Sequence, residues 1–457
     1  MYLTDTIAAI ATPPGCGSIG IVRVSGPSAE QVGQSVFRGN CGGGFESHRL
    51  YYGRFVQPVD GGLIDEGMVV LMRAPRSFTR EDVLELHCHG GYLVVRSVLQ
   101  ACLAAGARLA EPGEFTRRAF LNGRIDLCQA ESVIDIINSR TEASLALAQR
   151  QREGLLGREL EEVRRLLIAG LAVLEAHIDF PEEDIDPSAL ALVDQHVDAA
   201  RQRIGRLVDS FRFGKVLREG VSVVLAGKPN VGKSSLLNAL SCEERAIVSA
   251  IPGTTRDMIE EIVTIDGLPV RIIDAAGIRS HHADEIEREG IRRTMDKLTE
   301  ADLVLFLADG SHPLDDDDRA ILSAVAGRSF LTVTTKADLP QQLDQRLLPV
   351  CCGVVAISCH TAEGLDLLRS MLYDYFMHDA PPLSDDLVAL SNVRHRDILQ
   401  RAADLLDRFI SHDRSVCTLD LLAIDLRDAL SAVGEVTGAT TPDAVLDLVF
   451  STFCIGK

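Results

Sequence analysis

Residues 227–234 have the composition and spacing of a loop that binds phosphate. They read Gly-Lys-Pro-Asn-Val-Gly-Lys-Ser, follow a run of apolar residues and precede a predicted helix at 235–240. Glycines let consecutive backbone N–H groups curl around a phosphate, and the N-terminus of the next helix adds the positive end of its dipole. In this pattern Lys233 reaches the β- and γ-phosphates, and the hydroxyl of Ser234 ligates Mg²⁺. The sequence therefore predicts a nucleotide-binding site.

Two later segments are suited to follow a γ-phosphate. The polar stretch 253–257 contains Thr254 and Thr255, whose hydroxyls can complete the magnesium shell. An apolar strand then ends in Asp274 and is followed by Ala-Ala-Gly, with the glycine at Gly277. Asp274 can hold Mg²⁺ through a water molecule, and the N–H of Gly277 can meet the γ-phosphate. We therefore expect a nucleoside triphosphate in this site.

Two more segments favour guanine as the base. One predicted strand runs into Thr-Lys-Ala-Asp, ending at Asp338, and an aspartate here accepts hydrogen bonds from guanine N1 and N2 together. Adenine cannot offer that pair of donors. A further strand leads to Ser358-Cys-His, where a backbone N–H can reach guanine O6. Five ordered elements at the ends of successive strands predict a Ras-like GTPase domain, with a mostly parallel sheet and helices on both faces.

Three positions depart from the usual GTPase pattern. Ala275 stands where the pattern has threonine, so one hydroxyl contact is lost. Thr335 stands where it has asparagine, and the shorter side chain is expected to weaken the tether between the base loop and the phosphate loop. We expect guanine selectivity to persist through Asp338, with looser binding. Ile278 occupies the position of the glutamine that orients water in Ras-type enzymes, so another group must orient water and supply positive charge.

Composition restricts the class of protein and its partners. The length of 457 residues allows about three domains. A formal charge of −20 argues against a chain that engulfs nucleic acid unaided, because phosphate contact relies on basic surface. No apolar run is long enough to span a membrane, and the N-terminus lacks the layout of a signal or transit peptide. The eleven cysteines are scattered without a C-x-x-C pair, so we expect reduced thiols and a cytoplasmic protein.

The hydrophobic pattern divides the chain into four stretches. Residues 1–118 alternate between predicted strands and a packed helix, which is typical of an α+β domain. Residues 119–216 have helical periodicity, and the same periodicity returns at 381–457 after Pro381-Pro382. The GTPase stretch, 217–380, is therefore expected to be inserted into a helical domain. The predicted fold class is multidomain, α/β plus α.

Segments along the whole chain carry a resemblance to one family. Alone, the terminal Cys-Ile-Gly-Lys could be a frayed tail, and it does not match a prenylation box. Joined to an inserted GTPase domain, it resembles the MnmE (TrmE) family of tRNA-modification GTPases. The other matching segments are Asp-Thr-Ile at 5–7, Ala-Thr-Pro-Pro-Gly at 11–15, 77–82, 112–116, 118–123, 129–131 and 180–183.

The resemblance implies a function, partners and cofactors. Such proteins act with an FAD-dependent partner, MnmG (GidA), in a heterotetramer-like complex. Together they add an aminomethyl or carboxymethylaminomethyl group to C5 of the wobble uridine of certain tRNAs. The carbon comes from a tetrahydrofolate derivative, 5-formyl- or methylene-tetrahydrofolate. The N-terminal domain is implied to bind this folate and to form a homodimer, with Arg23, Glu85, Arg124 and Lys457 as the folate contacts.

The residues of the GTP site follow from the same resemblance. The family is potassium-dependent, and the implied K⁺ ligands are Asn230, Ser249, Ile251 and Thr254; those for Mg²⁺ are Ser234 and Thr255. The catalytic candidates are Glu287, which is thought to orient water, with Asn230, Arg256 and Cys454. The expected GTP contacts are Asn230, Val231, Gly232, Lys233, Ser234, Ser235, Ser249, Ala250, Ile251, Pro252, Gly253, Thr254, Thr255, Asp274, Ala275, Ala276, Gly277, Thr335, Lys336, Ala337, Asp338, Ser358, Cys359 and His360.

Plainer interpretations of several residues stay open. Arg23 and Glu85 alternate with apolar neighbours and could lie on a solvated strand face. Glu287 could be an exposed position on an acidic helix. No activating base is evident beside Cys454, which favours a structural or folate-pocket role over nucleophilic catalysis. His87 and His89 fall on one face of a strand, but no third metal ligand is indicated.

Two other functions compete with tRNA modification. One is a ribosome-assembly GTPase of the Era or Der type, which would bind RNA without covalent chemistry. Such proteins carry a KH-like domain, and neither its Gly-x-x-Gly loop nor a basic tail is evident here. The other is a purely structural protein that dimerises with GTP. Folate bound to residues 1–118 would distinguish tRNA modification from both.

Overall fold

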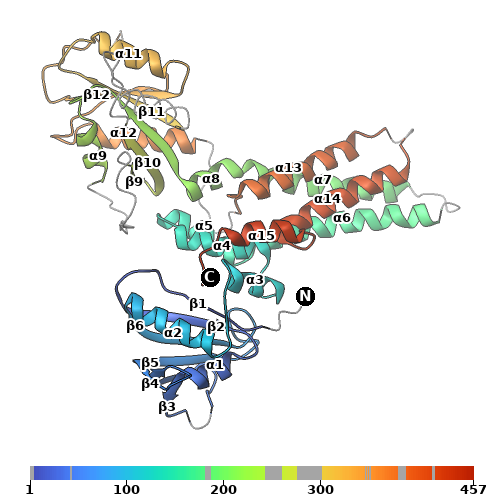
Figure 1. Cartoon of the computed structure of the whole chain (residues 1–457). Coiled ribbons are helices and arrows are strands. Elements are labelled where there is room, and N and C mark those ends of the chain that lie inside the picture. The colour runs from blue at the N-terminus through green and yellow to red at the C-terminus, as the bar shows by residue number, and fades with distance from the viewer. Residues whose placement is uncertain are drawn as a thin grey trace, which may run out of the picture. The chain divides into compact units, whose positions relative to one another are not determined.

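The computed structural model describes most of the chain. The described residues are 5–41, 44–180, 187–241, 260–274, 301–344, 346, 348, 351–378, 388–413 and 417–456. The chain divides into two compact units. Figure 1 labels the helices and strands. One unit consists of residues 1–134, 151–200 and 404–457, and the other of residues 135–150 and 201–403. The unit boundaries fall inside helices, and the predicted boundary at residue 118 lies within a helix too, Glu114–Leu121. The four predicted domain limits remain predictions.

The N-terminal part of the first unit is built on one sheet. Among the described residues this sheet has seven strands in the order β3-β4-β5-β6-β2-β1-β7, antiparallel except for the last pair. Helices α1 (Ala29–Val36) and α2 (Tyr92–Ala104) pack on one face, where their side chains share a core with alternate strand residues. The strands are β1 (Ile7–Ile10), β2 (Gly17–Ser25), β3 (Phe37–Gly39), β4 (Leu50–Val56), β5 (Leu63–Met72), β6 (Val83–Gly90) and β7 (Arg108–Leu109). This arrangement confirms the predicted α+β class.

The predicted helical periodicity corresponds to long helices. Within the first unit, α6 packs along α14, where Leu426 lies against Gly170. The buried residues of α6, most of them leucines, recur three or four positions apart and form one stripe, as an amphipathic helix requires. The helices that lie between the two sheets in the sequence, and again after residue 390, are α3 (Glu114–Leu121), α4 (Leu127–Asn138), α5 (Glu142–Arg152), α6 (Leu155–Asp179), α7 (Pro187–Asp209), α8 (Phe211–Glu219), α13 (Val393–Ser411), α14 (Leu419–Thr437) and α15 (Asp443–Ser451).

The second unit contains the predicted GTPase sheet. Its described strands run in the order β13-β12-β11-β8-β10-β9, parallel except for β9 at one edge. The strands are β8 (Val221–Ala226), β9 (Glu260–Ile265), β10 (Leu268–Asp274), β11 (Leu303–Asp309), β12 (Phe330–Thr335) and β13 (Val354–Ala356). In a mostly parallel sheet, ligands bind outside the carboxyl ends of the strands. Here those ends carry the predicted nucleotide-binding elements.

Helices cover both faces of this sheet, as predicted. Val223 and Leu225 of β8 join a core with α9 (Lys233–Ser241) and α12 (Leu365–Met377). Val224 and Ala226, which point the other way, join a second core with α11 (Asp316–Val325). Burial on both faces explains why β8 is a continuous apolar run and does not alternate with polar residues.

Two expectations from composition can be compared with the structure. The cysteines among the described residues are all free thiols. Among those same residues, no helix has both the length and the apolar composition needed to cross a bilayer.

Candidate functional site: a nucleotide loop and a polar cluster

The loop between β8 and α9 has the backbone needed to surround a phosphate. Asn230 and Gly232 adopt left-handed conformations, with φ of 63° and 110°. Helix α9 begins at Lys233, so its N-terminus faces the loop. The Lys233 ammonium is buried and donates to the carbonyls of Gly227 at 2.7 Å and Lys228 at 2.8 Å. Ser234 follows with an exposed side chain, available as a hydroxyl ligand.

The part of the site expected around the γ-phosphate lies outside the described residues. Asp274 ends β10 as predicted, but only its backbone is described. The predicted site residues that lie wholly outside the described part of the chain here are Ser249, Ala250, Ile251, Pro252, Gly253, Thr254, Thr255, Arg256, Ala275, Ala276, Gly277 and Glu287.

Thr335 connects the base-binding segment to the phosphate loop. Its buried hydroxyl donates to the carbonyl of Val231 at 2.7 Å. It also lies 3.3 Å from the carbonyl of Ala308 at the end of β11. The sequence predicted a weaker tether because threonine is shorter than asparagine. The structure shows that the shorter side chain still reaches the loop directly, while the strength of the tether remains a prediction.

The predicted guanine-binding carboxylate is held by a residue of the other base loop. The hydroxyl of Ser358 donates to Asp338 at 2.6 Å, and this hydrogen bond lowers the pKa of the Asp338 carboxyl. The same Ser358 oxygen accepts from the backbone N–H groups of His360 and Thr361, each at 3.2 Å. Sequence reasoning assigned only backbone contacts to 358–360 and therefore missed this side chain. A serine following a predicted strand was the available signal.

A second acidic residue, not predicted for the site, pairs with the base loop. Lys336 donates to Asp309 at 2.6 Å, from a backbone with φ of 60°. Burial opposes ionisation of Asp309, but hydrogen bonds from Lys336 and Ser311 outweigh it and lower the pKa of the carboxyl to about 2. The base loop is therefore fixed to the ends of both β11 and β12.

A second cluster, in the first unit, brings together Arg23, Glu85 and their neighbours. Arg23 and Glu85 are direct cross-strand partners on β2 and β6, and their side chains form an ion pair at 2.8 Å. The Glu85 carboxylate also lies 3.4 Å from His87. A hydrogen bond from His87 lowers the pKa of Glu85 most strongly, and Arg23 adds to this effect against the opposing influence of burial. The two residues therefore do not lie on a simple solvated face.

Aromatic rings join the cluster to Arg124. The guanidinium of Arg23 lies 5.9 Å from the ring centres of both Phe78 and Phe115. The guanidinium of Arg124 lies 5.2 Å from the ring centre of Phe78, so the two arginines share this ring. Arg124 also donates to the carbonyl of Ser77. Two of the four predicted folate residues, Arg23 and Arg124, therefore lie over one phenylalanine that the sequence reasoning did not select, and Glu85 is joined to them through its ion pair with Arg23.

The C-terminal tail reaches this same cluster within its own chain. The carbonyl of Gly456 accepts from Arg23 at 3.5 Å, and the carbonyl of Cys454 accepts from Gly113 at 3.4 Å. Gly456 has a φ of 95°, and an added Cβ would lie 2.1 Å from the carbonyl oxygen of Ile10. Cys454 is exposed. Lys457, the fourth predicted folate contact, lies outside the described residues.

The donor groups fit the cofactors that the sequence implied. An exposed serine hydroxyl beside a buried lysine, at a helix N-terminus, suits Mg²⁺ with a phosphate. A carboxylate such as Glu85 can accept from pterin N–H groups, Phe78 offers an aromatic face, and two arginines suit the glutamate tail of a folate. Among the described residues, no group of three His, Cys, Asp or Glu side chains could hold a metal.

The fold and the first of these sites define a P-loop GTPase. Comparison with known proteins then identifies the family. The family model described as "GTP-binding protein TrmE N-terminus" matches residues 6–124, and "MnmE helical domain" matches residues 127–454. The chain is 57% identical over 457 residues to the tRNA modification GTPase MnmE of Geobacter sulfurreducens, covering 100% of both chains. It is 46% identical to that of Heliobacterium modesticaldum, covering 99% of each. The chain belongs to the MnmE family of tRNA modification GTPases, and it is a GTP-hydrolysing enzyme.

Part of the chain is also similar to a solved structure. The crystal structure of the G domain of the T. maritima FeoB iron transporter is 31% identical and covers 34% of this chain and 98% of that one. Its TM-score is 0.28, which is too low to carry a structural argument.

Proposed function

We propose that the protein hydrolyses GTP in order to modify the wobble uridine of certain tRNAs. It would act with the FAD-dependent MnmG (GidA) and add an aminomethyl or carboxymethylaminomethyl group at C5. The observation that carries this proposal is the presence of two separate sites in one chain. One is the nucleotide loop at 227–234, and the other is the Arg23–Glu85 cluster with the tail at Gly456. A GTP-binding switch without covalent chemistry needs only the first.

The GTP site would bind its ligand with residues from all five predicted elements. Lys233 would contact the phosphates, Ser234 and Thr255 would ligate Mg²⁺, and Asp338 would read the guanine edge. The hydrogen bond from Ser358 supports this last role, because it orients the carboxylate and favours its ionised form. The whole set of expected contacts is proposed as given from the sequence.

A potassium ion would supply the positive charge that an arginine finger gives in other GTPases. Asn230 would be its side-chain ligand, with Ser249, Ile251 and Thr254 completing the shell. A monovalent cation there would stabilise charge developing on the phosphates. Glu287 would orient water, and Arg256 is proposed as a further catalytic residue. Asn230 supports the proposal through its position in the loop, where the left-handed backbone turns before Gly232.

The second cluster would bind the tetrahydrofolate derivative. Glu85 would accept from the pterin, while Arg23, Arg124 and Lys457 would offer positive charge. Cys454 would shape the pocket, a role that the sequence favours over that of a nucleophile. The folate would supply the one-carbon unit for the reaction.

A homodimer through the N-terminal domain and a cytoplasmic location complete the proposal. The sheet face opposite α1 and α2 exposes apolar side chains of neighbouring strands. Tyr52 and Met68 are cross-strand partners on this face, and Leu50 and Leu63 are also exposed. Exposed apolar side chains gathered on one face are typical of interaction sites in soluble proteins.

Folate binding is the measurement that tests the proposal. Calorimetric titration of the full chain with 5-formyl-tetrahydrofolate should show binding, and Glu85→Gln should weaken it about tenfold, since one charged acceptor is lost. His89→Ala is the matched control, because His89 lies on the same strand but pairs with Asp65 outside the cluster. Both variants should hydrolyse GTP at the wild-type rate. Absence of folate binding by the wild type would favour the ribosome-assembly alternative.

A further inference from the structure

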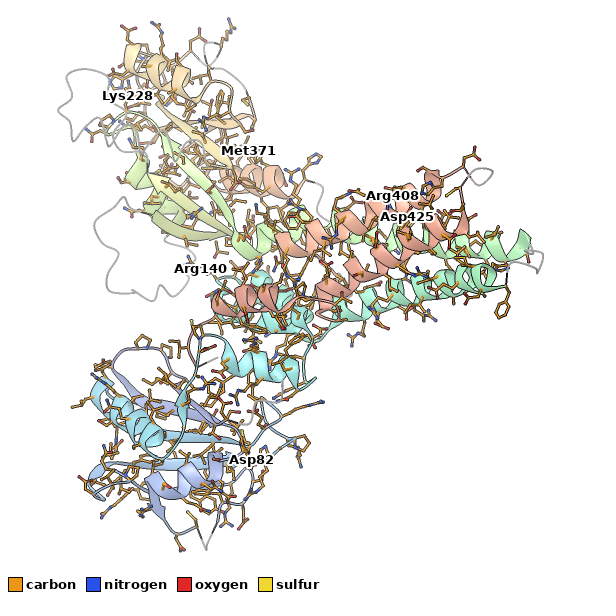
Figure 2. The ribbon with its side chains drawn as sticks, turned by 45° about the vertical axis from the view of Figure 1, so that its right-hand side comes forward. Asp82, Arg140, Lys228, Met371, Arg408 and Asp425 are labelled. Atoms are coloured by element: carbon orange, nitrogen blue, oxygen red, sulfur yellow. The ribbon has the colours of Figure 1, made fainter. Side chains whose placement is uncertain are left out.

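The second residue of the phosphate loop is fixed to a neighbouring helix by its side chain. The ammonium of Lys228 lies between two carboxylates, 2.7 Å from Asp315 and 2.8 Å from Asp318 (Figure 2 labels Lys228). Lys228 is partly buried, with a side-chain exposure of 20%. The loop and the start of α11 are 87 positions apart in the sequence. This three-residue contact is called the loop clamp below.

The two carboxylates of the loop clamp are held rigidly by the helix they begin. Asp315 is the N-cap of α11, and its side chain accepts from the N–H of Asp318 at 3.1 Å. The Asp318 side chain accepts in return from the N–H of Asp315 at 3.2 Å, which completes a capping box. Lys228 therefore binds a preorganised pair of acceptors and not two mobile surface groups.

Asp318 makes this contact more than a surface ion pair. Its side chain is 4% exposed, and burial raises the pKa of its carboxyl. One of its oxygens, Oδ1, has no hydrogen-bond partner among the described residues. A carboxylate desolvated in this way depends on a nearby cation, so removing that cation is costly. Exposed ion pairs, by contrast, contribute little.

The backbone of the clamped residue holds the phosphate-binding lysine. The carbonyl of Lys228, together with that of Gly227, accepts from the ammonium of Lys233. The side chain of Lys228 thus fixes the position of its own backbone carbonyl. That carbonyl in turn holds the ammonium of Lys233. At the other side of the loop, the hydroxyl of Thr335 binds the carbonyl of Val231. The loop is restrained at both sides of Asn230.

We propose that Lys228 is a positioning residue for nucleotide binding: clamped to Asp315 and Asp318, it sets the loop carbonyls that aim Lys233 at the phosphates. The inference rests on the proposed phosphate contact of Lys233. Because the clamp acts on the resting loop, it contributes equally to the ground state and the transition state. Its loss should therefore raise KM and leave kcat nearly unchanged.

The test uses the full-length protein and four variants. Lys228→Met keeps the length of the side chain but removes its charge, and we expect Kd for GDP and KM for GTP to rise about tenfold, with kcat changed less than about twofold. Lys228→Arg keeps the charge and should stay within about threefold of wild type. Asp316→Asn is the control, because Asp316 begins the same helix, is fully exposed and forms its ion pair with Arg319 and not with Lys228. Its Kd and KM should be those of wild type.

The fourth variant separates positioning from folding. Asp318→Asn retains an oxygen for the capping box while removing the buried charge, so it should fold and weaken GDP binding in the same direction as Lys228→Met. Nucleotide affinities of Lys228→Met and Asp318→Asn equal to wild type would overturn the clamp, even if both lower the Tm. A loss of kcat with unchanged KM would overturn it too.

One further arm tests the premise separately. Lys233→Ala should abolish nucleotide binding if Lys233 contacts the phosphates. Binding retained in Lys233→Ala would contradict the proposed site itself. Binding lost in Lys233→Ala but intact in Lys228→Met would overturn only the clamp.

Discussion

Thr335 shows how a single hydroxyl can replace a longer side chain. The residue lies at the end of β12, buried, with its oxygen 2.7 Å from the carbonyl of Val231 in the phosphate loop. A buried carbonyl left without its donor carries a desolvation penalty of about 1–3 kcal/mol. The hydroxyl therefore matters for the relative position of the base loop and the phosphate loop.

Removing this hydroxyl should loosen GDP. In Thr335→Val the shape is kept but the donor is lost, and we expect Kd for GDP to rise roughly five- to tenfold. Thr335→Ser retains the donor and should remain close to wild type. Fluorescence titration with a labelled GDP measures both. Equal affinities in Thr335→Val and Thr335→Ser would show that the tether contributes nothing.

Asp338 should determine which purine is accepted. In Asp338→Asn the amide presents a donor where the carboxylate accepted, which mismatches the guanine N2 amino group and matches the C2 carbonyl of xanthine. The hydroxyl of Ser358, 2.6 Å from Asp338, can still donate to the amide oxygen and orient the side chain. We expect hydrolysis of GTP to fall at least about a hundredfold and hydrolysis of xanthosine triphosphate to rise. Unchanged preference for GTP would remove Asp338 from the base site.

At the scale of elements, α3 is joined to the N-terminal sheet through a buried arginine. Arg118 is fully buried, and its guanidinium contacts Asp5 and Glu114 at 2.8 and 2.9 Å and Glu81 at 3.3 Å. Arg108 binds Asp5 and Glu114 from the other side, both at 2.7 Å. Each of these five charged side chains therefore has at least one oppositely charged partner in the network.

Truncating Arg118 should therefore be severe. Arg118→Met leaves the buried carboxylate of Glu114, and those of Glu81 and Asp5, without their central cation, and we expect a loss of roughly 3–5 kcal/mol in the free energy of unfolding. Arg165→Met is a matched control, because its ion pair with Glu162 is exposed on α6, and such pairs contribute about 0–1 kcal/mol. Urea unfolding of the two variants measures the difference. Similar losses in both would contradict the importance of burial.

The elements were easier to predict from sequence than the contacts between them. The sequence predicts strands at the mostly apolar runs 221–226 and 330–334, and the structure has β8 at Val221–Ala226 and β12 at Phe330–Thr335. The hydrogen bond between Ser358 and Asp338 was not predicted. Local patterns indicate which face of an element is buried, but they do not indicate which distant residue meets it. The same reason explains why Phe78 was not selected beside Arg23.

At the scale of the whole molecule, the nucleotide loop and the Arg23 cluster belong to different units. The tail from Cys454 belongs to the unit that holds Arg23, and its last described residue, Gly456, contacts Arg23 and Ile10. A change in the tail should therefore affect tRNA modification and leave GTP hydrolysis intact.

Deleting residues 454–457 should abolish tRNA modification and leave GTP hydrolysis within about twofold of wild type, since the removed contacts are local to one unit. Gly456→Ala should reproduce the loss of modification, because its Cβ has no room beside the carbonyl of Ile10 and its φ is unfavourable for alanine. Ile455→Ala is the control, because that side chain is half exposed. Both activities are measured on the same preparations. Full modification after deletion would refute a role for the tail, and loss of both activities would indicate misfolding.

Helix α5 limits how the GTPase part can be separated from the rest. Leu147 of α5 and Phe213 of α8 are buried in the same core as the sheet residues, and Ala143 lies 3.8 Å from the Cβ position of Gly267 in the turn between β9 and β10. A fragment of residues 217–380 would lose Leu147, Phe213 and Ala389. The apolar core residues that these side chains cover would then be exposed to water. The GTPase part thus has its own sheet but shares its core with α5 and α8. A version of it fused to another protein would need these helices to be included.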